Sequence, residues 1–335
     1  MINMLFNGAP ANIMALAGQH TPFCTSFSAR YSFPAACFIM TCLLLVKCND
    51  RLPKDQGREF AVNGALSAGK PRGAGFIFIL VFIVSVVLFC ELNTEIIIYL
   101  VLLAAAMMTG FLDDCSRAPW GELKKGLLDF AIAVMVAITF LNFNSNVVEF
   151  AIFGGSITIP PVIFGILTVV LVWVSINVTN CSDGVDGLSG TLTIITLISL
   201  YMVDQIKGMD PVFSHTILLF VICILAYLWF NATPSKLMMG DAGSRAMGFF
   251  ISIAALKTGS PFIYIPVAIV LILDGGLGLL KVSLLRFLKI RILVNTRTPL
   301  HDHVRKVMGW SNTQAVFRFA IIQIMISAAV IYLIM

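Results

Sequence analysis

The sequence predicts an all-α, polytopic membrane protein, a helix bundle with about ten transmembrane helices. Hydrophobic residues make up 59% of the chain and charged residues only 12%, whereas soluble domains carry about 25% charged residues. Several apolar runs also reach the ~20 residues that one helix needs to cross a bilayer. We therefore treat residues 1–335 as a single integral membrane domain, with residues 1–30 as an N-terminal extension before the first span.

The apolar runs are separated by clusters of Gly, Pro, Asn or charged residues, which are typical of loops. These boundaries predict spans at residues 31–47, 74–91, 94–111, 127–142, 159–176, 188–203, 213–230, 244–256, 262–286 and 315–334. The ninth run is the longest and ends in a basic stretch, which favours a last part outside the membrane.

The Lys and Arg residues are divided unequally between the two sets of loops. One set holds eighteen of them, and the opposite set holds only Arg30, Lys207 and Lys257. Cytoplasmic loops carry the excess of positive residues, so the basic set is predicted to be cytoplasmic. Both termini then face outward, and an even number of spans fits this alternation.

Four polar clusters lie in the predicted cytoplasmic loops or at the adjoining helix ends. They are Asp113–Asp114, Asn177–Gly187, Gly240–Ser244 and Pro299–His303. Each cluster alone also fits an ordinary helix end, turn or cap, because Asp, Asn and Gly favour such positions. The third cluster comes just before a predicted helix, where free N–H groups favour an anion. The predicted outward loops contain nothing comparable.

Together the clusters indicate a phosphate-processing site at the inner membrane surface. Five aspartates gather there beside basic residues: Asp113, Asp114, Asp183, Asp186 and Asp241. Mg²⁺ commonly takes one or two carboxylates plus substrate phosphates, and Lys and Arg bind phosphates directly. The sequence carries no Walker-type or dinucleotide-binding fingerprint, so we expect no familiar soluble nucleotide-binding fold.

In this combination the residues resemble the polyprenyl-phosphate N-acetylhexosamine-1-phosphate transferases. The similarity consists of the Asp-Asp pair, Asn-x-x-Asn-x-x-Asp-Gly-x-Asp-Gly-Leu, Gly-Asp-x-Gly-Ser and a His-x-His motif, in matching order over about residues 50–335. The segment Thr298–His303, followed by Gly309-Trp310 and Arg318-Phe319, is most similar to the phospho-N-acetylmuramoyl-pentapeptide transferase branch.

The resemblance implies a reaction and its partners. The expected reaction moves phospho-N-acetylmuramoyl-pentapeptide from its UDP-linked precursor (UDP-MurNAc-pentapeptide) to undecaprenyl phosphate, which releases UMP and forms lipid I of peptidoglycan synthesis. The resemblance implies Mg²⁺ as cofactor and a multi-pass protein among the lipids of the bacterial inner (plasma) membrane, with the active site facing the cytoplasm. It implies no nucleic-acid partner and leaves a homodimer open.

The resemblance also implies roles for single residues. The expected catalytic residues are Asp113, Asp114, Asp241 and His301, with one of the adjacent pair as the base that deprotonates the lipid phosphate. The expected metal ligands are Asp241 and Asn180. Either Lys124 or Lys125 takes the place of a phosphate-binding lysine. The full set of expected substrate-binding residues is Asn177, Asn180, Asp183, Asp186, Lys124, Lys125, Arg117, Lys70, Ser244 and His303.

Some positions depart from the family pattern. Asp302 stands where the branch usually has the middle of three histidines, and Arg117 stands where a lysine is common. Met238 stands where an aromatic residue commonly stacks on uracil, and the segment Lys70–Gly75 fits its motif only in part. These departures bear on nucleoside recognition, not on the reaction class.

Two other interpretations remain open from the sequence. A sister branch that uses UDP-GlcNAc shares the four clusters, although the segment from Pro299 to Trp310 favours the muramoyl-pentapeptide branch. A secondary transporter would explain Asp129 and Asp274, which fall inside predicted spans, because intramembrane acids often mark ion pathways. The gathering of acids at one face, and the lack of a convincing internal repeat, disfavour the transporter.

Overall fold

The computed structural model describes residues 27–55, 57, 67–116, 118, 120–208 and 210–335. Residues 1–26 of the expected N-terminal extension, and Arg117 among the expected site residues, lie outside this part of the chain. The long helices are α3 (Phe27–Cys48), α4 (Ala74–Phe89), α5 (Thr94–Asp114), α6 (Glu122–Phe143), α7 (Pro161–Cys181), α8 (Leu188–Lys207), α9 (Pro211–Asn231), α10 (Gly240–Lys257) and α15 (Asn312–Ile334).

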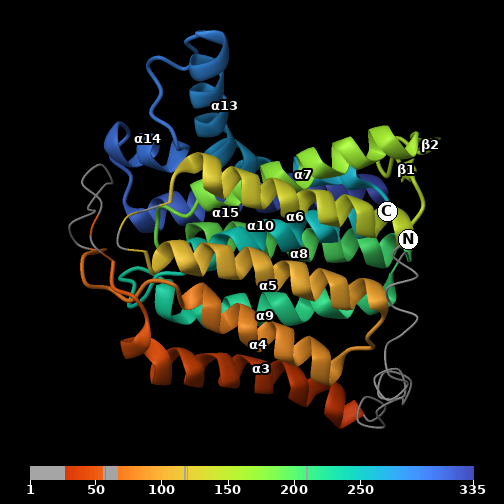
Figure 1. Cartoon of the computed structure of the whole chain (residues 1–335), viewed down its shortest axis with the longest axis horizontal. Coiled ribbons are helices and arrows are strands. Elements are labelled where there is room, and N and C mark those ends of the chain that lie inside the picture. The colour runs from red at the N-terminus through yellow and green to blue at the C-terminus, as the bar shows by residue number, and fades with distance from the viewer. Residues whose placement is uncertain (1–26, 56, 58–66, 117, 119, 209) are drawn as a thin grey trace.

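Shorter helical pieces connect or extend the long helices. They are η2 (Asn49–Arg51), η4 (Pro261–Ile263), α11 (Tyr264–Val267), α12 (Ile269–Leu271), η5 (Ile272–Gly276), α13 (Leu277–Ser283), η6 (Leu284–Leu288) and α14 (Leu300–Lys306). A short hairpin between α6 and α7 pairs β1 (Val147–Glu149) with β2 (Ser156–Thr158) in antiparallel register. The hairpin lies at the same end of the bundle as the C-terminus (Figure 1).

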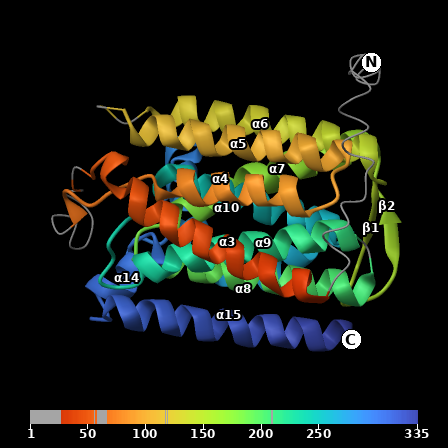
Figure 2. The same ribbon diagram turned by 90° about the horizontal axis from the view of Figure 1, so that it is seen from below.

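The long helices run side by side, and α10 lies among them (Figure 2). Every residue of α10 from Gly240 to Leu256 is buried, and this helix packs against α4, α5, α7 and α8. Helices in membranes associate through close packing at small residues. A Cβ atom on Gly75 of α4 or on Gly110 of α5 would overlap the backbone of α10 at Gly243 or Asp241. Close approach at these glycines therefore sets the position of Asp241.

Within the described residues, seven helices are long and apolar enough to cross a membrane: α3, α5, α6, α7, α8, α9 and α15. A bent pair, Pro261–Val267 and Ile269–Leu288, makes up to eight. Helix α4 has only 16 residues and α10 carries three charged side chains, yet both lie within the same bundle. Each predicted apolar run corresponds to one of these helices, which confirms the all-α polytopic fold.

The ninth predicted span, 262–286, is not one straight helix. Its two parts meet at an angle of 72°, and Ala268 between them has the non-helical dihedral φ −122°. At the break, the side chain of Gln323 accepts from the Val270 N–H and donates to the Val267 carbonyl, both at 2.8 Å. The second part contains the π-helical segments η5 and η6 and carries α13 away from the bundle (Figure 1).

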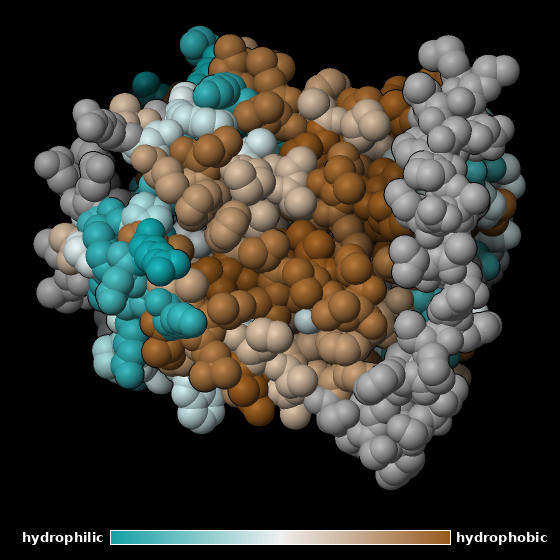
Figure 3. Space-filling model, turned by 60° about the horizontal axis from the view of Figure 1, so that its bottom comes forward, coloured by the Kyte–Doolittle hydropathy of each residue, from teal (hydrophilic) through white to brown (hydrophobic). Residues whose placement is uncertain are grey.

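Several residues that were expected in loops are helical. Helix α5 continues to Asp114, and α7 continues to Cys181. Helix α10 begins at Gly240, and α14 covers the expected histidine loop. The surface of the bundle fits a bilayer, because hydrophobic side chains cover the middle of one face and hydrophilic ones gather at one end (Figure 3).

Candidate active site

The predicted acidic cluster forms where the end of α5 meets the start of α10. Two cations bridge its carboxylates. The Arg72 guanidinium, in the segment just before α4, places Nε 2.9 Å from Oδ1 of Asp114 and Nη2 3.2 Å from Oδ1 of Asp241. Lys125 of α6 places Nζ 3.0 Å from Oδ2 of Asp241 and also pairs with Asp113. The fold thus brings Asp113, Asp114 and Asp241 together.

The start of α10 is an anion site, as expected, and its occupant is a carboxylate of the protein itself. Asp114 accepts hydrogen bonds from the backbone N–H groups of Asp241 and Ala242, both at 3.2 Å. Gly240 has φ +67°, and a Cβ atom there would overlap the Asp114 carboxylate. Only glycine combines that dihedral with so close an approach, so Gly240 and Asp114 fix Asp241 against the end of α5.

The cluster carries more negative than positive charge. Four carboxylates face two cations in this group of ion pairs, whose members are Asp55, Asp113, Asp114, Asp241, Arg72 and Lys125. Burial by itself disfavours the charged form of Arg72, but the carboxylates of Asp114 and Asp241 outweigh it and raise the pKa of Arg72 above its usual value. The excess of two carboxylates favours a divalent cation.

The described residues contain no group of three or more His, Cys, Asp or Glu side chains arranged to hold a metal ion by themselves. The donor set nevertheless fits Mg²⁺, which takes one or two protein carboxylates and completes its shell with water and phosphate oxygens. Asp241 supplies one carboxylate. Asn180 is held nearby, because its Nδ2 donates to Oγ of Ser244 at 2.9 Å and that hydroxyl donates to the Gly240 carbonyl at 3.0 Å.

His301 forms a second part of the site together with Asp274. The Nδ1 atom of His301 lies 2.9 Å from Oδ2 of Asp274, and its backbone N–H donates to Oδ1 at 2.7 Å. The imidazole also packs against Gly184, where a Cβ atom would overlap the ring. Arg305 donates to the Gly184 carbonyl at 3.2 Å, and burial lowers the pKa of Arg305 below its usual value.

The loop between α7 and α8 joins the two parts. Asp183 lies close enough to contribute to the electrostatic stabilisation of Arg72 in the acidic cluster. Asp186 has the same effect on Arg305 beside the histidine. The loop that carries both aspartates therefore lies near both sets of basic groups.

The two candidate lysines have separate surroundings. Lys125 points to the carboxylates of Asp113 and Asp241. Lys124 is exposed, and its Nζ lies 3.3 Å from the centroid of the Trp120 ring. The structure therefore places Lys125, not Lys124, at the acidic cluster.

Other expected residues lie around this centre and contact different groups. Lys70 donates from Nζ to Oγ of Ser235 at 3.0 Å. Nδ1 of His303 accepts from the backbone N–H of Arg297 at 3.3 Å. Asn177 donates to the Trp173 carbonyl at 2.8 Å, on its own helix. These contacts do not join the three side chains to the carboxylates of Asp113, Asp114 and Asp241.

Sequence reasoning missed Arg72 and Asp55 as members of the acidic cluster. Arg72 lies in the segment whose motif fits the family only in part, and Lys70 was chosen there instead. The position of Arg72 was a usable signal, because Arg72 directly precedes Gly73 and the start of α4. This is the end of the bundle at which the aspartates lie. Asp274 was noted only as an acid within a span, although it is the partner of His301.

Comparison with known proteins places this site in a family. A family model described as glycosyl transferase family 4 matches residues 96–259. A phospho-N-acetylmuramoyl-pentapeptide-transferase of Treponema pallidum (strain Nichols) is 41% identical over 290 residues, which cover 81% of this chain and 80% of that protein. The chain belongs to the phospho-N-acetylmuramoyl-pentapeptide-transferase family. This membership confirms the predicted family and branch, and it makes the protein a transferase.

More distant members of the phospho-N-acetylmuramoyl-pentapeptide-transferase family also match most of the chain. One from Fervidobacterium nodosum is 28% identical over 261 residues, covering 75% of this chain and 79% of that protein. One from Wolbachia sp. subsp. Drosophila simulans (strain wRi) is 26% identical over 272 residues, covering 77% and 82%. The transporter interpretation is set aside, because Asp129 pairs with Arg245 and Asp274 pairs with His301 beside the site of a transferase.

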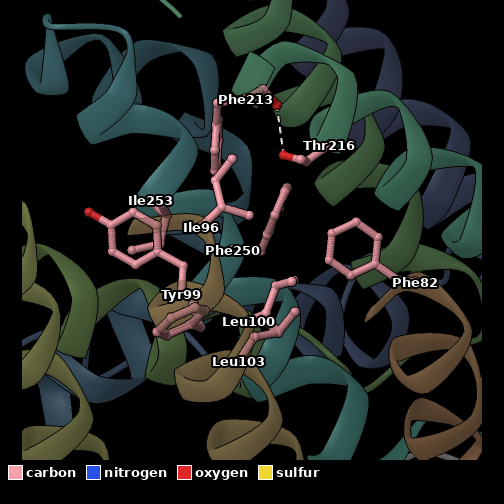
Figure 4. A pocket seen from close by; sticks show the side chains of 10 residues that line it. Phe82, Ile96, Tyr99, Leu100, Leu103, Phe213, Thr216, Phe250 and Ile253 are labelled. Atoms are coloured by element: carbon pink, nitrogen blue, oxygen red, sulfur yellow. Dashed lines mark hydrogen bonds between the residues drawn. The ribbon is translucent and has the colours of Figure 1, made fainter. Parts of the chain in front are cut away.

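A small apolar cavity lies elsewhere in the bundle (Figure 4). Its lining includes Tyr99 near the start of α5, whereas Asp113 and Asp114 end that helix. The hydroxyl of Thr216 donates to the Phe213 carbonyl at 2.7 Å, so this group is already satisfied. We assign no chemistry to this cavity.

Proposed function

We propose that the protein transfers phospho-N-acetylmuramoyl-pentapeptide from its UDP-linked precursor to undecaprenyl phosphate, releasing UMP and forming lipid I. The observation that carries this proposal is the carboxylate of Asp241, which is paired with Arg72 and Lys125 at one end of a membrane bundle. These cations are suited to exchange a carboxylate for a phosphate. A soluble nucleotide donor and a lipid acceptor can meet only at the membrane surface.

Charge repulsion is the main obstacle to this reaction. Two unit charges 4 Å apart repel by ~1 kcal/mol in water and ~4 kcal/mol at an effective dielectric constant of 20, and both substrates carry phosphates. Arg72 and Lys125 would bind the donor diphosphate and offset this repulsion. When bound at Asp241 and Asn180, Mg²⁺ supplies further neutralisation of the diphosphate and of the leaving UMP.

Asp113 is the better candidate for the base. The side chain of Asp114 is fully buried, pairs with Arg72 and accepts hydrogen bonds from two backbone N–H groups of α10, so its role is to hold the site together. Asp113 pairs through one oxygen with Lys125 and accepts from the backbone N–H of Trp120 through the other at 2.6 Å. Release of Lys125 to a phosphate would free a carboxylate oxygen to take the proton of the lipid phosphate.

The bond changes follow directly. An oxygen of undecaprenyl phosphate forms a bond to the β-phosphorus of the donor. The bond from that phosphorus to the bridging oxygen breaks, and UMP leaves with the bonding electrons. The proton released by the acceptor passes to Asp113. His301, held by Asp274, would orient the loop that carries Asp183 and Asp186 against the donor.

The proposal places the carboxylate end of the bundle at the cytoplasmic side of the bacterial inner membrane. Its support is the division of Lys and Arg, eighteen against three, between the two sets of loops. Accessibility of a single cysteine introduced at Lys236, compared with one introduced at Gly155 in the hairpin, tests this orientation in intact cells. Labelling of the Lys236 position from outside would overturn it.

The deciding experiment measures UMP release by the purified protein. We expect turnover with UDP-MurNAc-pentapeptide only when undecaprenyl phosphate and Mg²⁺ are both present. Equal or faster release from UDP-GlcNAc would overturn the proposed sugar donor. Full turnover in excess EDTA would overturn the metal proposal while leaving the transfer itself in place.

A further inference from the structure

Two ion pairs connect α6 and α10 one helical turn apart. The first pair joins Lys125 to Asp241 at 3.0 Å and belongs to the candidate active site. The second pair joins Asp129 to Arg245, whose side chains are 1% and 3% exposed. In each helix the two members are four residues apart and so lie on the same face. The two pairs therefore form two rungs between the helices.

The side chains of the two rungs connect two helices that otherwise pack mainly against other helices. Helix α6 packs mainly against α5 and α7, and α10 packs mainly against the same two helices. Arg245 also donates to the carbonyl of Lys125 at 3.4 Å. Trp173 of α7 donates from Nε1 to the carbonyl of Gly126 at 3.1 Å. The helical turn that carries Lys125 is thus held by side chains from α10 and α7.

The polarity of the two rungs alternates. Along α6 the order is Lys125 then Asp129, and along α10 it is Asp241 then Arg245. A shift of α6 by one turn in one direction would bring Lys125 opposite Arg245, and a shift in the other would bring Asp129 opposite Asp241. Like charges repel strongly where little water screens them. Only the observed register satisfies both rungs.

A purely stabilising role does not account for the second rung. Burying an ion pair removes it from water, and well-packed apolar residues in its place are often equally stable or more so. Within the described residues Nε of Arg245 is buried without a hydrogen bond, which adds to this cost. Asp129 does receive a further long contact, at 3.4 Å, from Nδ2 of Asn177. The best-attested benefit of buried polar pairs is register.

We propose that Asp129 and Arg245 are positioning residues that fix the register of α6 against α10 and so hold Lys125 at the active-site carboxylates. Neither residue touches the substrate. They act through Lys125, and the inference rests on the proposed function, in which Lys125 binds the donor diphosphate. The substrate class on which the pair acts is therefore a nucleoside diphosphate sugar.

The main test replaces both members of the rung with apolar residues, in the double variant Asp129→Leu/Arg245→Leu. We expect this variant to fold, with a thermal midpoint close to wild type, because no charge is left unpaired. Turnover per folded molecule should fall at least 10-fold, because the charge repulsion that disfavours a shift of Lys125 by one turn is then lost. Turnover within two-fold of wild type would overturn the proposal.

A second variant keeps the charges but removes their alternation. The exchange Asp129→Arg/Arg245→Asp restores an ion pair, yet both rungs then have the same polarity and the donor to the Lys125 carbonyl is lost. We expect this exchange to recover thermal stability relative to Arg245→Gln without recovering turnover. Recovery of both thermal stability and turnover would show that the ion pair only stabilises the fold, and would contradict the positioning role.

The matched control is a buried ion pair at the other end of the bundle, between Glu95 and Lys257. The double variant Glu95→Leu/Lys257→Leu should keep the turnover of the folded fraction. Wild-type protein is measured in the same assay. Absence of UMP release from wild type signals failure of the proposed function, whereas an active Asp129/Arg245 apolar variant signals failure of the positioning role alone.

Discussion

Both ends of the bundle carry buried ion pairs, but their carboxylates have different partners. At the active-site end, the Asp241 carboxylate contacts Arg72 and Lys125, both cationic. At the opposite end, Glu95 pairs with Lys257 at 3.0 Å and also accepts from the Tyr99 hydroxyl at 2.9 Å and from the Asn144 amide at 2.6 Å. Charge and burial alone do not separate a working site from a structural one.

The difference lies in what the partners can do. Tyr99 and Asn144 are neutral donors that hold Glu95 in one place. Asp210 at the same end caps the start of α9 and lies 2.7 Å from Lys257, so Lys257 ties together the ends of several helices. Arg72 and Lys125, in contrast, are cations that a substrate phosphate or a divalent ion can displace from Asp241.

The largest expected effect comes from Asp241→Asn. The amide keeps the shape of the side chain but removes the charge, so it binds a divalent cation poorly and leaves Arg72 and Lys125 without their shared anion. We expect turnover to fall by about 10³-fold, as for loss of a central electrostatic group, with little change in thermal midpoint. UMP release per folded molecule measures the effect.

The same substitution at the opposite end is the control. Asp210→Asn changes a helix cap for one of similar quality and should leave turnover within two-fold. Equal losses at Asp210 and Asp241 would remove the distinction between the two ends.

A smaller loss is expected for His301→Ala. Asp274 is fully buried, and the substitution removes its imidazole partner, which costs about 1–3 kcal/mol of stability. The loop around Gly184 also loses the ring that it packs against. We expect turnover to fall by about 10²-fold, which is the loss that a small misplacement of substrate-positioning groups can cause. Unchanged kcat and KM would remove His301 from the site.

His215→Ala serves as the histidine control, because His215 is exposed on α9. This variant should match wild type in turnover and in thermal midpoint. A comparable loss there would point to a general effect of histidine removal on the purified protein.

The sequence predicted the helices and most of the acids because both signals are local. Apolar runs identified the spans, and Asp113, Asp114 and Asp241 stood out beside them. Ion pairs between distant segments could not be predicted from the sequence, since Arg72 and Asp241 are 169 positions apart. Neighbouring lysines could not be separated either, because a helix turns Lys124 and Lys125 about 100° apart and only packing decides which one faces inward.

The break in the ninth predicted span could not be predicted from the sequence either. An apolar run reports length and polarity, and Pro266 alone marks either a kink or a helix start. The 72° bend depends on Ala268 and on the contacts of α11 and α12 with α8 and α15, which are tertiary. In the same way, the anion site at Gly240 was predictable from the helix start, but not that Asp114 fills it.

The opposite end supplies a prediction in which stability and turnover separate. Lys257→Gln leaves Glu95 and Asp210 without their common cation, and breaking a buried ion pair costs about 3–5 kcal/mol. We expect a clear drop in thermal midpoint and unchanged turnover of the protein that remains folded. A loss of turnover without a loss of stability would show that this end communicates with the active site.

The smallest effect is expected at Lys124. Its ammonium group lies 3.3 Å from the centroid of the Trp120 ring, and an exposed contact of this kind contributes only about 0.5–1 kcal/mol. Lys124→Gln should therefore change turnover less than two-fold, whereas Lys125→Gln should lower it at least 10-fold, since Asp113 and Asp241 lose their shared cation. The pair of variants, compared at the same donor concentration, tests side-chain direction within one helical turn. If Lys124→Gln were the more damaging change, α6 would bind substrate through its exposed face. Lys125 would then not be the cation that distinguishes the active-site end of the bundle from the opposite end.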